Sequence, residues 1–302
     1  MTKITSIIPP KFLLGLIISV LFLTKGLDGF AQHRQIIISP EFMGPNALPV
    51  PEIRTGLISE DFNLKIAFES HSSPGDKTKN LFTELFIPIV SNKVGLMLSV
   101  VPIEYFDMDQ ATLTKRKIVS TDGTGRAGGD IYVGTHVQIF KDHNYIPDVL
   151  LNINIKTASG TNLEFARHTD SPGYAFDVST GKDIALGSDL FKSIRFYGTF
   201  GFYVYQTHRT DFLQNDAYSW GIGFDLNFNK LQFKNALGGY RGHIGDGDRP
   251  TVFRSTLGTN FDSMVNYEVR FQQGIADIDF TTFRIGVNLD LGYLKKYFGG
   301  NN

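Results

Sequence analysis

The sequence predicts an all-β fold, a transmembrane antiparallel β-barrel of about twelve strands with short turns at one end and longer loops at the other. Segments in which large apolar residues alternate with small or polar ones recur along the chain, the links between them alternate in length, and the one long apolar run lies near the N-terminus. Side chains alternate across a strand, and a tilted membrane strand needs about 9–11 residues. Because strand limits taken from a sequence slip by a few residues, ten to fourteen strands remain compatible.

The clearest segment is 216–229. One face carries large apolar side chains: Tyr218, Trp220, Ile222, Phe224, Leu226 and Phe228. The other carries small or polar ones: Ser219, Gly221, Gly223, Asp225 and Asn227. Aromatic rings at both ends suit a strand that crosses a bilayer. A soluble β-sandwich would also contain such a strand, so the prediction depends on its recurrence.

The pattern recurs in order along the chain. The predicted strands are DFNLKIAFES (61–70), NLFTELFIPIV (80–90), VGLMLSVVPIEYF (94–106), GDIYVGTHVQIF (129–140), PDVLLNINIK (147–156), GYAFDVSTGKD (173–183), IRFYGTFGFYVYQ (194–206), 216–229, LQFKNALGGY (231–240), TVFRSTLGTN (251–260), VNYEVRFQQ (265–273) and TFRIGVNLDLGY (282–293). Alternation is weakest in 80–90, 231–240 and 251–260. Pro102 predicts a bulge, since proline cannot donate to a strand ladder.

The links indicate an orientation. Links after even-numbered strands are short, as at 91–93, 229–230 and 261–264, whereas those after odd-numbered strands are mostly longer, the longest being 107–128. Bacterial barrels have short periplasmic turns and longer outer loops. We therefore expect the long links outside and both termini in the periplasm.

The N-terminus predicts export. Lys3 and Lys11 precede an apolar core at 12–23, and the small residues Gly29 and Ala31 precede a cleavage point ahead of Gln32. This is the pattern of a signal peptide, here 1–31. A membrane-anchoring helix is the alternative, but the run is short for a span of about 20 residues. An exported chain of amphipathic strands fits the outer membrane of a Gram-negative cell.

The remaining organisation is simple. Residues 32–60 are Pro-rich and irregular and are predicted as a periplasmic lead-in that could plug the barrel, which spans 61–295 and precedes a tail at 296–302. A net charge of −1 argues against nucleic-acid binding. The absence of cysteine excludes disulfides and thiolate metal sites. No cofactor is predicted.

The polar faces would line the lumen. The inward-facing candidates carry both signs of charge: Lys65, Glu69, Asp130, His136, Lys156, Asp177, Arg195, Asp225, Glu268, Arg270, Arg284 and Asp290. Barrels of about eight strands are filled by side chains, and those of sixteen to eighteen hold a channel. A barrel of about twelve could conduct a small polar solute or be closed by salt bridges.

Two glycine motifs have ordinary explanations. The G-x-G-x-x-G pattern at 123–128 binds a dinucleotide only at a strand-to-helix turn, and here a strand follows, so a flexible outer loop is predicted. The GDGD sequence at 245–248 offers too few oxygens for calcium and predicts a turn. The basic run at 115–117 is either a solvated loop or a contact for lipopolysaccharide.

An enzyme is the least favoured class. An outer-membrane phospholipase would need histidine and serine together on the lipid face. His136 is predicted inward, His143 in a periplasmic turn, and His71, His168, His208 and His243 in or beside outer loops. No catalytic residue is therefore predicted.

Three stretches resemble an outer-membrane family named for the MetA pathway of phenol degradation. They are GDIYVG (129–134), LNINIKTASG (151–160) and DSPGYAFDVSTGK (170–182), about a fifth of the chain. The proline usual before the glycine is absent at Ala158-Ser159-Gly160. The resemblance implies a barrel with a transport role and carries over no site residue. The F-A-Q exit at 30–32 is similar to signal peptides of Bacteroidota.

The predicted function is therefore passive passage of a small solute, with apolar or aromatic solutes included. The alternative is a non-conducting barrel that acts as a scaffold or docks a partner, and the third is a barrel enzyme. The expected surroundings are outer-membrane lipid and lipopolysaccharide, and no protein partner is predicted.

Overall fold

The computed structural model describes residues 36–141, 144–188 and 190–293. The predicted signal peptide, the predicted C-terminal tail and His143 lie outside the described residues.

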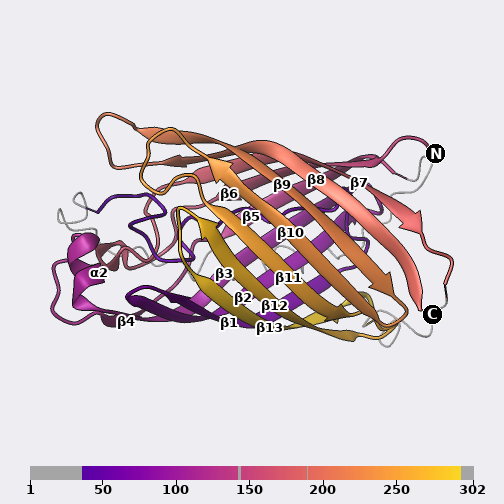
Figure 1. Cartoon of the computed structure of the whole chain (residues 1–302), viewed down its shortest axis with the longest axis horizontal. Coiled ribbons are helices and arrows are strands. Elements are labelled where there is room, and N and C mark those ends of the chain that lie inside the picture. Colours follow the sequence, from indigo (N-terminus) through magenta and orange to yellow (C-terminus); the bar gives the residue numbers. More distant parts are fainter. Residues whose placement is uncertain (1–35, 142–143, 189, 294–302) are drawn as a thin grey trace, which may run out of the picture.

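Twelve antiparallel strands close into a barrel, as predicted (Figure 1). They are β1 (Asn63–Ser73), β2 (Asp76–Val90), β3 (Val94–Met108), β5 (Tyr132–Phe140), β6 (Asp148–Lys156), β7 (Gly173–Ala185), β8 (Phe191–Gln206), β9 (Gln214–Phe228), β10 (Leu231–Arg241), β11 (Thr251–Thr259), β12 (Val265–Ala276) and β13 (Thr281–Asp290). Each pairs with its neighbour in sequence, and β1 pairs with β13 to complete the ring. The β2–β3 register shifts beside Pro102, where Leu81 lies opposite Ile103 but Thr83 lies opposite Val100, which confirms the predicted bulge.

The long connections gather at one end of the barrel, on the left in Figure 1. The link after β3 contains helix α2 (Gln110–Lys115), and the link after β6 contains the 3-10 turn η2 (Leu163–Phe165). The carboxylate of Asp109 accepts a hydrogen bond from the Thr112 N–H at 2.8 Å and so caps α2. Within the described residues, every helix is too short or too polar to cross a bilayer.

Two details of this end differ from the prediction. The glycine motif lies in a short strand, β4 (Thr124–Ala127), that pairs with β3. A Cβ at Gly125 would lie 2.5 Å from the Phe106 ring, so the glycine permits close pairing where a flexible loop was expected. The first link is also shorter than expected, because β1 and β2 continue through polar residues to a turn at Gly75, whose φ is +74°.

The outer surface of the barrel is apolar, whereas most of the buried side chains in the strands are polar. Phe200, Tyr218, Ile222 and Ile285 are all more than half exposed. Phe200 and Tyr218 stack on neighbouring strands with ring centroids 6.3 Å apart. An apolar exterior around a polar interior is the pattern of a barrel surrounded by lipid.

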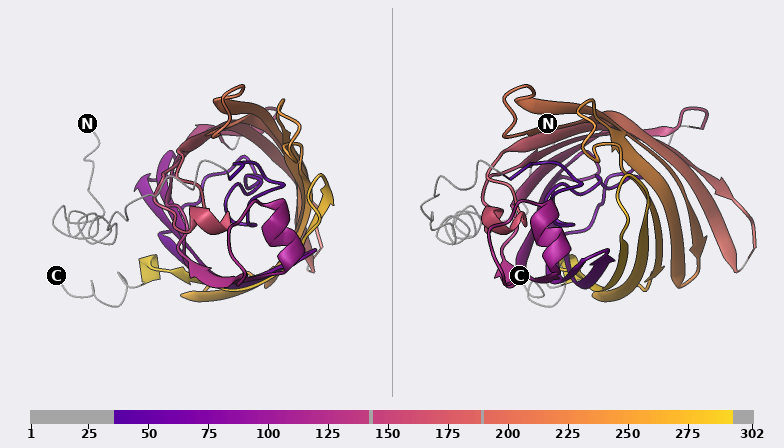
Figure 2. Two further views of the ribbon diagram at one scale, coloured as in Figure 1. Left: turned by 90° about the vertical axis from the view of Figure 1, so that its left-hand side faces the viewer. Right: turned by 60° about the vertical axis from the view of Figure 1, so that its left-hand side comes forward.

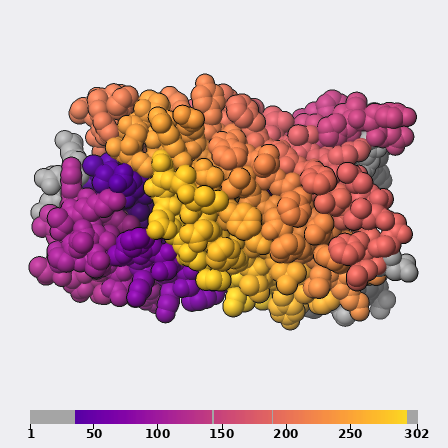
Figure 3. All heavy atoms as spheres, viewed as in Figure 1, coloured from indigo at the N-terminus to yellow at the C-terminus, as the bar shows by residue number. Residues whose placement is uncertain are grey.

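Residues 36–60, called the N-terminal segment below, lie inside the barrel (Figure 2). Figure 3 shows part of the segment, in indigo, at the surface beside the long loops. The segment ends near the short turns, where β1 begins. Because it passes along the lumen, its contacts decide how much of the lumen stays open.

Candidate functional site

Apolar packing holds the first half of the N-terminal segment near the long loops. Ile36, Ile38 and Leu48 are buried in a cluster with Tyr203 and Tyr240 of the barrel wall. The Tyr240 hydroxyl also donates to the Leu48 carbonyl at 3.2 Å. Burial of such side chains contributes roughly 1.5–3 kcal/mol each, so this half is firmly placed.

Polar contacts hold the second half on its way through the lumen. Arg254 of β11 donates to the backbone carbonyls of Val50 at 2.5 Å and Pro51 at 2.8 Å. Arg270 of β12 pairs with Glu52 at 2.6 Å. The wall therefore binds both the backbone and a side chain of the segment.

The opposite wall continues these contacts towards the short turns. Arg195 of β8 donates to the Thr55 carbonyl at 2.9 Å. Gln138 of β5 donates to the Gly56 carbonyl at 2.8 Å and accepts from the Ile58 N–H at 2.7 Å. Glu60 then pairs with Lys141, just after β5. The segment is thus attached at both ends of the lumen and between them.

A buried cluster of charges surrounds the first half of the segment. Arg167, from the link after β6, is fully buried and lies 2.7 Å from both Glu104 Oε1 and Asp76 Oδ2. Arg116, which follows α2, reaches the same Asp76 oxygen at 2.6 Å. Asn46 of the segment donates to Glu104 Oε2 at 2.6 Å. The cluster therefore ties two long loops and the segment to β2 and β3.

His168, beside Arg167, is buried within this cluster. Its Nε2 lies 3.7 Å from Glu104 Oε2, and neither ring nitrogen makes a hydrogen bond with the described residues. Burial lowers the pKa of the imidazole, while the nearby Glu104 carboxylate opposes that shift.

The basic run at 115–117 is partly engaged in holding its own loop. Lys115 pairs with Glu41 of the N-terminal segment at 3.1 Å, and Arg116 is buried against Asp76. Two of its three charges therefore serve the loop itself, and lipopolysaccharide contact remains a prediction.

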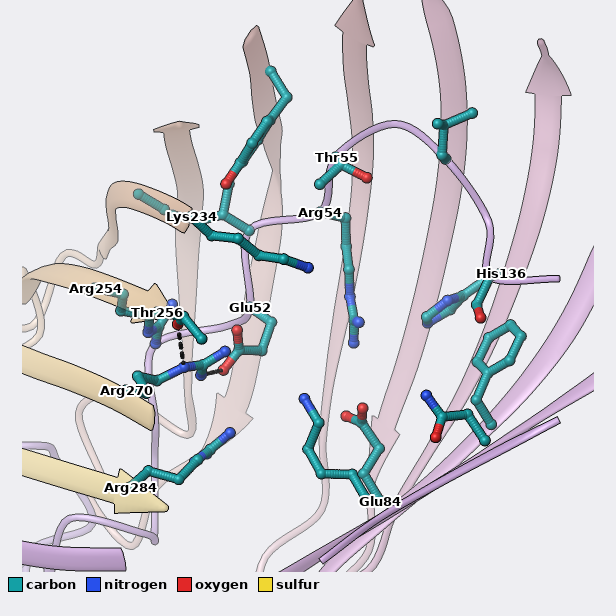
Figure 4. A pocket seen from close by; sticks show the side chains of 18 of the residues that line it. Glu52, Arg54, Thr55, Glu84, His136, Lys234, Arg254, Thr256, Arg270 and Arg284 are labelled. Carbon is teal, nitrogen blue, oxygen red and sulfur yellow. Dashed lines mark hydrogen bonds and ion pairs between the residues drawn. The ribbon is translucent and has the colours of Figure 1, made fainter. Parts of the chain in front are cut away.

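Two cavities beside the segment have volumes of about 250 Å³ and about 170 Å³. The larger is lined by the segment and by β1, β2, β5, β8 and β10 to β13, and Figure 4 shows charged side chains pointing into it. The two cavities share the lining residues Glu52, Arg54, Phe82, Glu84, Arg254 and Arg284. They therefore adjoin along the segment.

The inward-facing residues predicted from the sequence occupy three kinds of place. Those that border the cavities are Lys65, Glu69, Asp130, His136, Asp177, Arg270 and Arg284. Four others contact a second residue of the barrel wall: Lys156 contacts Asp130 at 2.8 Å, Arg195 contacts Asp148 at 2.8 Å, Glu268 contacts Lys65 at 3.1 Å, and Asp225 contacts the Tyr197 hydroxyl at 2.9 Å. Asp290 lies at the end of β13, where it accepts from the Gly292 N–H at 2.8 Å.

Five charged residues that line one or both cavities were not predicted from the sequence: Glu52, Arg54, Glu84, Lys234 and Arg254. Three of them lie in the strands with the weakest alternation. Lys234 could have been found, because it lies directly opposite Asp225 across the β9–β10 hairpin and opposite residues share a face. Glu52 and Arg54 lie in an irregular stretch that has no periodicity to interpret.

The remaining motifs have structural roles. His71 lies within β1, where its ring nitrogens contact Thr282 at 2.7 Å and Asn80 at 2.8 Å. The carboxylate of Asp248 accepts from the N–H groups of Ile244 at 2.7 Å and Gly245 at 3.1 Å, which forms the predicted turn. Within the described parts of the chain, no three potential metal ligands among His, Asp and Glu gather.

No family model matches the chain, and no curated protein matches it. An outer membrane channel from Pseudomonas putida F1 is similar in structure, with a TM-score of 0.51, 9% identity, and coverage of 80% of this chain and 98% of that one. The KdgM porin in complex with disordered oligogalacturonate gives a TM-score of 0.44 at 12% identity, covering 74% and 98%. The translocator domain of the autotransporter NalP from Neisseria meningitidis gives 0.44 at 10% identity, covering 77% and 89%. At such identities, the likeness to the Pseudomonas channel shows a shared fold.

Proposed function

We propose that this chain is a passive outer-membrane channel for a small solute, narrowed by its own N-terminal segment. The observation that carries the proposal is the pair of adjoining cavities beside that segment. A lumen completely filled by side chains would leave no such space. The solute would pass between the segment and the wall, along a route bordered by charged groups.

The placement in the membrane rests on the exterior. Its apolar, aromatic surface suits lipid, and the fold is shared with an outer membrane channel. We place the long loops outside the cell and the short turns in the periplasm. Export by a cleaved signal peptide, a Bacteroidota source and membership of the MetA-pathway family remain predictions from the sequence.

A non-conducting scaffold is the second candidate. The buried Arg167 cluster and the contacts of Arg254, Arg270 and Arg195 with the segment favour it, because they close part of the lumen. In that case, the same segment would be a permanent plug. The two candidates differ in whether the intact chain passes current.

Conductance tests the proposal. The mature chain, residues 32–302, is refolded and inserted into planar bilayers, and a variant that lacks residues 33–60 is treated in the same way. The heat-dependent shift in gel mobility that folded barrels show checks that both are folded. We expect a steady, small conductance from the intact chain and a larger one from the truncation. Current from the truncation alone would support a plug. The absence of current from both folded chains would exclude the channel.

A further inference from the structure

The larger cavity has an excess of positive charge. Its lining includes six cationic side chains, namely Arg54, Lys65, Lys234, Arg254, Arg270 and Arg284, and two carboxylates, Glu52 and Glu84. Three further carboxylates lie close behind these groups: Glu69, Glu268 and Asp225. Six positive groups therefore face five negative ones around a single small space.

Most of these charges are already satisfied. Arg270 is paired with Glu52 at 2.6 Å, Lys65 with Glu268 at 3.1 Å, and Arg284 with Glu69 at 2.6 Å. Arg254 donates to backbone carbonyls of the N-terminal segment and to Gln272. Asp225 accepts hydrogen bonds from the neutral groups of Tyr197 and Gln232, at 2.9 and 3.4 Å, and its charge attracts Lys234 on the neighbouring strand.

Among the residues that the structure describes, two cations and one carboxylate of the lining have no oppositely charged group at ion-pair distance. The hydrogen bond found for the Arg54 guanidinium is to the Met97 sulfur at 3.1 Å, a weak acceptor. Within the described residues, the Lys234 ammonium makes no hydrogen bond and no ion pair, and neither does the Glu84 carboxylate. In Figure 4, Lys234, Arg54 and Glu84 extend into the same open space from the wall and from the segment.

Such an arrangement is suited to bind an anion. A cation held inside a protein without a partner loses much of its hydration, and a bound carboxylate or phosphate restores its hydrogen bonds. Two cations on different elements, one on β10 and one on the segment, offer two points of attachment. Glu84 faces them and can accept a hydrogen bond from a hydroxyl of the same solute.

We propose that the larger cavity is a binding site for a small hydroxylated organic anion, held by Lys234 and Arg54 and oriented by Glu84. This deepens the proposed channel function by naming the class of solute, and it rests on that function only as far as passage is concerned. Binding itself needs the cavity alone.

Calorimetric titration of the refolded mature chain with malate, a hydroxylated dicarboxylate, tests the site. Erythritol serves as the neutral probe and spermidine as the cationic one. We expect malate alone to bind. Lys234→Met and Arg54→Met should each weaken binding at least tenfold, the effect of losing about 1.4 kcal/mol of interaction. Lys234→Arg should retain binding and shows that the position tolerates change.

Lys79→Met is the matched control, because it removes the same charge from an exposed position of β2. Binding of malate that is equally strong in Lys234→Met and Lys79→Met would overturn the site, as would the absence of malate binding to the folded chain.

Reversal potentials in a KCl gradient separate the site from the channel. A chain that binds malate but passes no current retains the anion site and contradicts the channel. A chain that conducts without preferring anions and without binding malate retains the channel and contradicts the site.

Discussion

Replacing Arg167 by methionine should destabilise the end of the barrel that carries the long loops. The guanidinium has no solvent exposure, and it contacts Glu104, Asp76 and Thr78, each at 2.7 Å. Methionine has a similar length but no charge, so Glu104 would remain buried with Asn46 and a neutral His168 as its neighbours. Asp76 would keep its ion pair with Arg116.

We expect Arg167→Met to lower the free energy of unfolding strongly, because it leaves the Glu104 carboxylate without its ion-pair partner. Removing one partner of a buried ion pair costs about 3–5 kcal/mol, because the other charge stays buried and uncompensated. Arg116→Met is the comparison, since Asp76 then keeps Arg167 and the loss should be nearer to about 1.5 kcal/mol, the value of one charged hydrogen bond. Adding Glu104→Gln to Arg167→Met should recover part of the stability.

The assay is urea unfolding of the refolded chain in lipid vesicles, followed by the fluorescence of Trp220, the single tryptophan. Limited proteolysis of the N-terminal segment provides a local measurement, since Asn46 is tied to the same cluster. The reasoning would be refuted if Arg167→Met lowered the free energy of unfolding by less than about 1 kcal/mol, or by the same amount as Arg116→Met.

Two further predictions concern the lipid face and pH. Ile222→Arg places a charge at the middle of the lipid-facing side of β9 and should lower the free energy of unfolding by about 2–4 kcal/mol. Leu231→Arg, near a barrel end, should lower it by only about 0–1 kcal/mol. Urea unfolding in vesicles measures both. The pKa of His168 is lowered in the folded chain, so the unfolded chain binds a proton first as pH falls. Stability should therefore decline below about pH 6.5, by up to about 1.4 kcal/mol per pH unit, and His168→Gln should reduce that slope. An unchanged slope in His168→Gln would contradict the assignment.

The sequence predicted the barrel well because lipid imposes a strict alternation. In β9, Trp220 and Ile222 face lipid while Gly221 and Asp225 face the lumen, and no other arrangement hides the polar groups. Some strands continue beyond the lipid into polar residues, as β1 and β2 do near Gly75. In those parts the alternation of apolar and polar residues stops before the strand ends, so the sequence does not show the full strand.

The lumen could be predicted only in part. Inward residues on clear strands, such as Glu69, follow from alternation. The groups that fill the space do not, because Glu52 and Arg54 lie in an irregular segment and are placed by contacts with Arg270 and Met97, far away in sequence. Arg167 lies in a loop and is likewise placed by Asp76 and Glu104.

The central claim is that residues 36–60 occupy the lumen, and a disulfide tests it most directly because the chain has no native cysteine. A Cβ at Gly221 would lie 2.5 Å from Ile53 Cγ1. A carbon–carbon bond is about 1.5 Å, so the two Cβ atoms lie within about 4 Å, compatible with a disulfide.

The measurement is cross-linking of Ile53→Cys with Gly221→Cys in membranes of cells that express the chain, scored by thiol labelling with and without reductant. Ile53→Cys with Ile222→Cys is the control, because Ile222 is 60% exposed on the outer face. The account predicts that the first pair forms a disulfide and the second does not. Free thiols in the first pair of a folded barrel would place the segment outside the lumen and contradict the account.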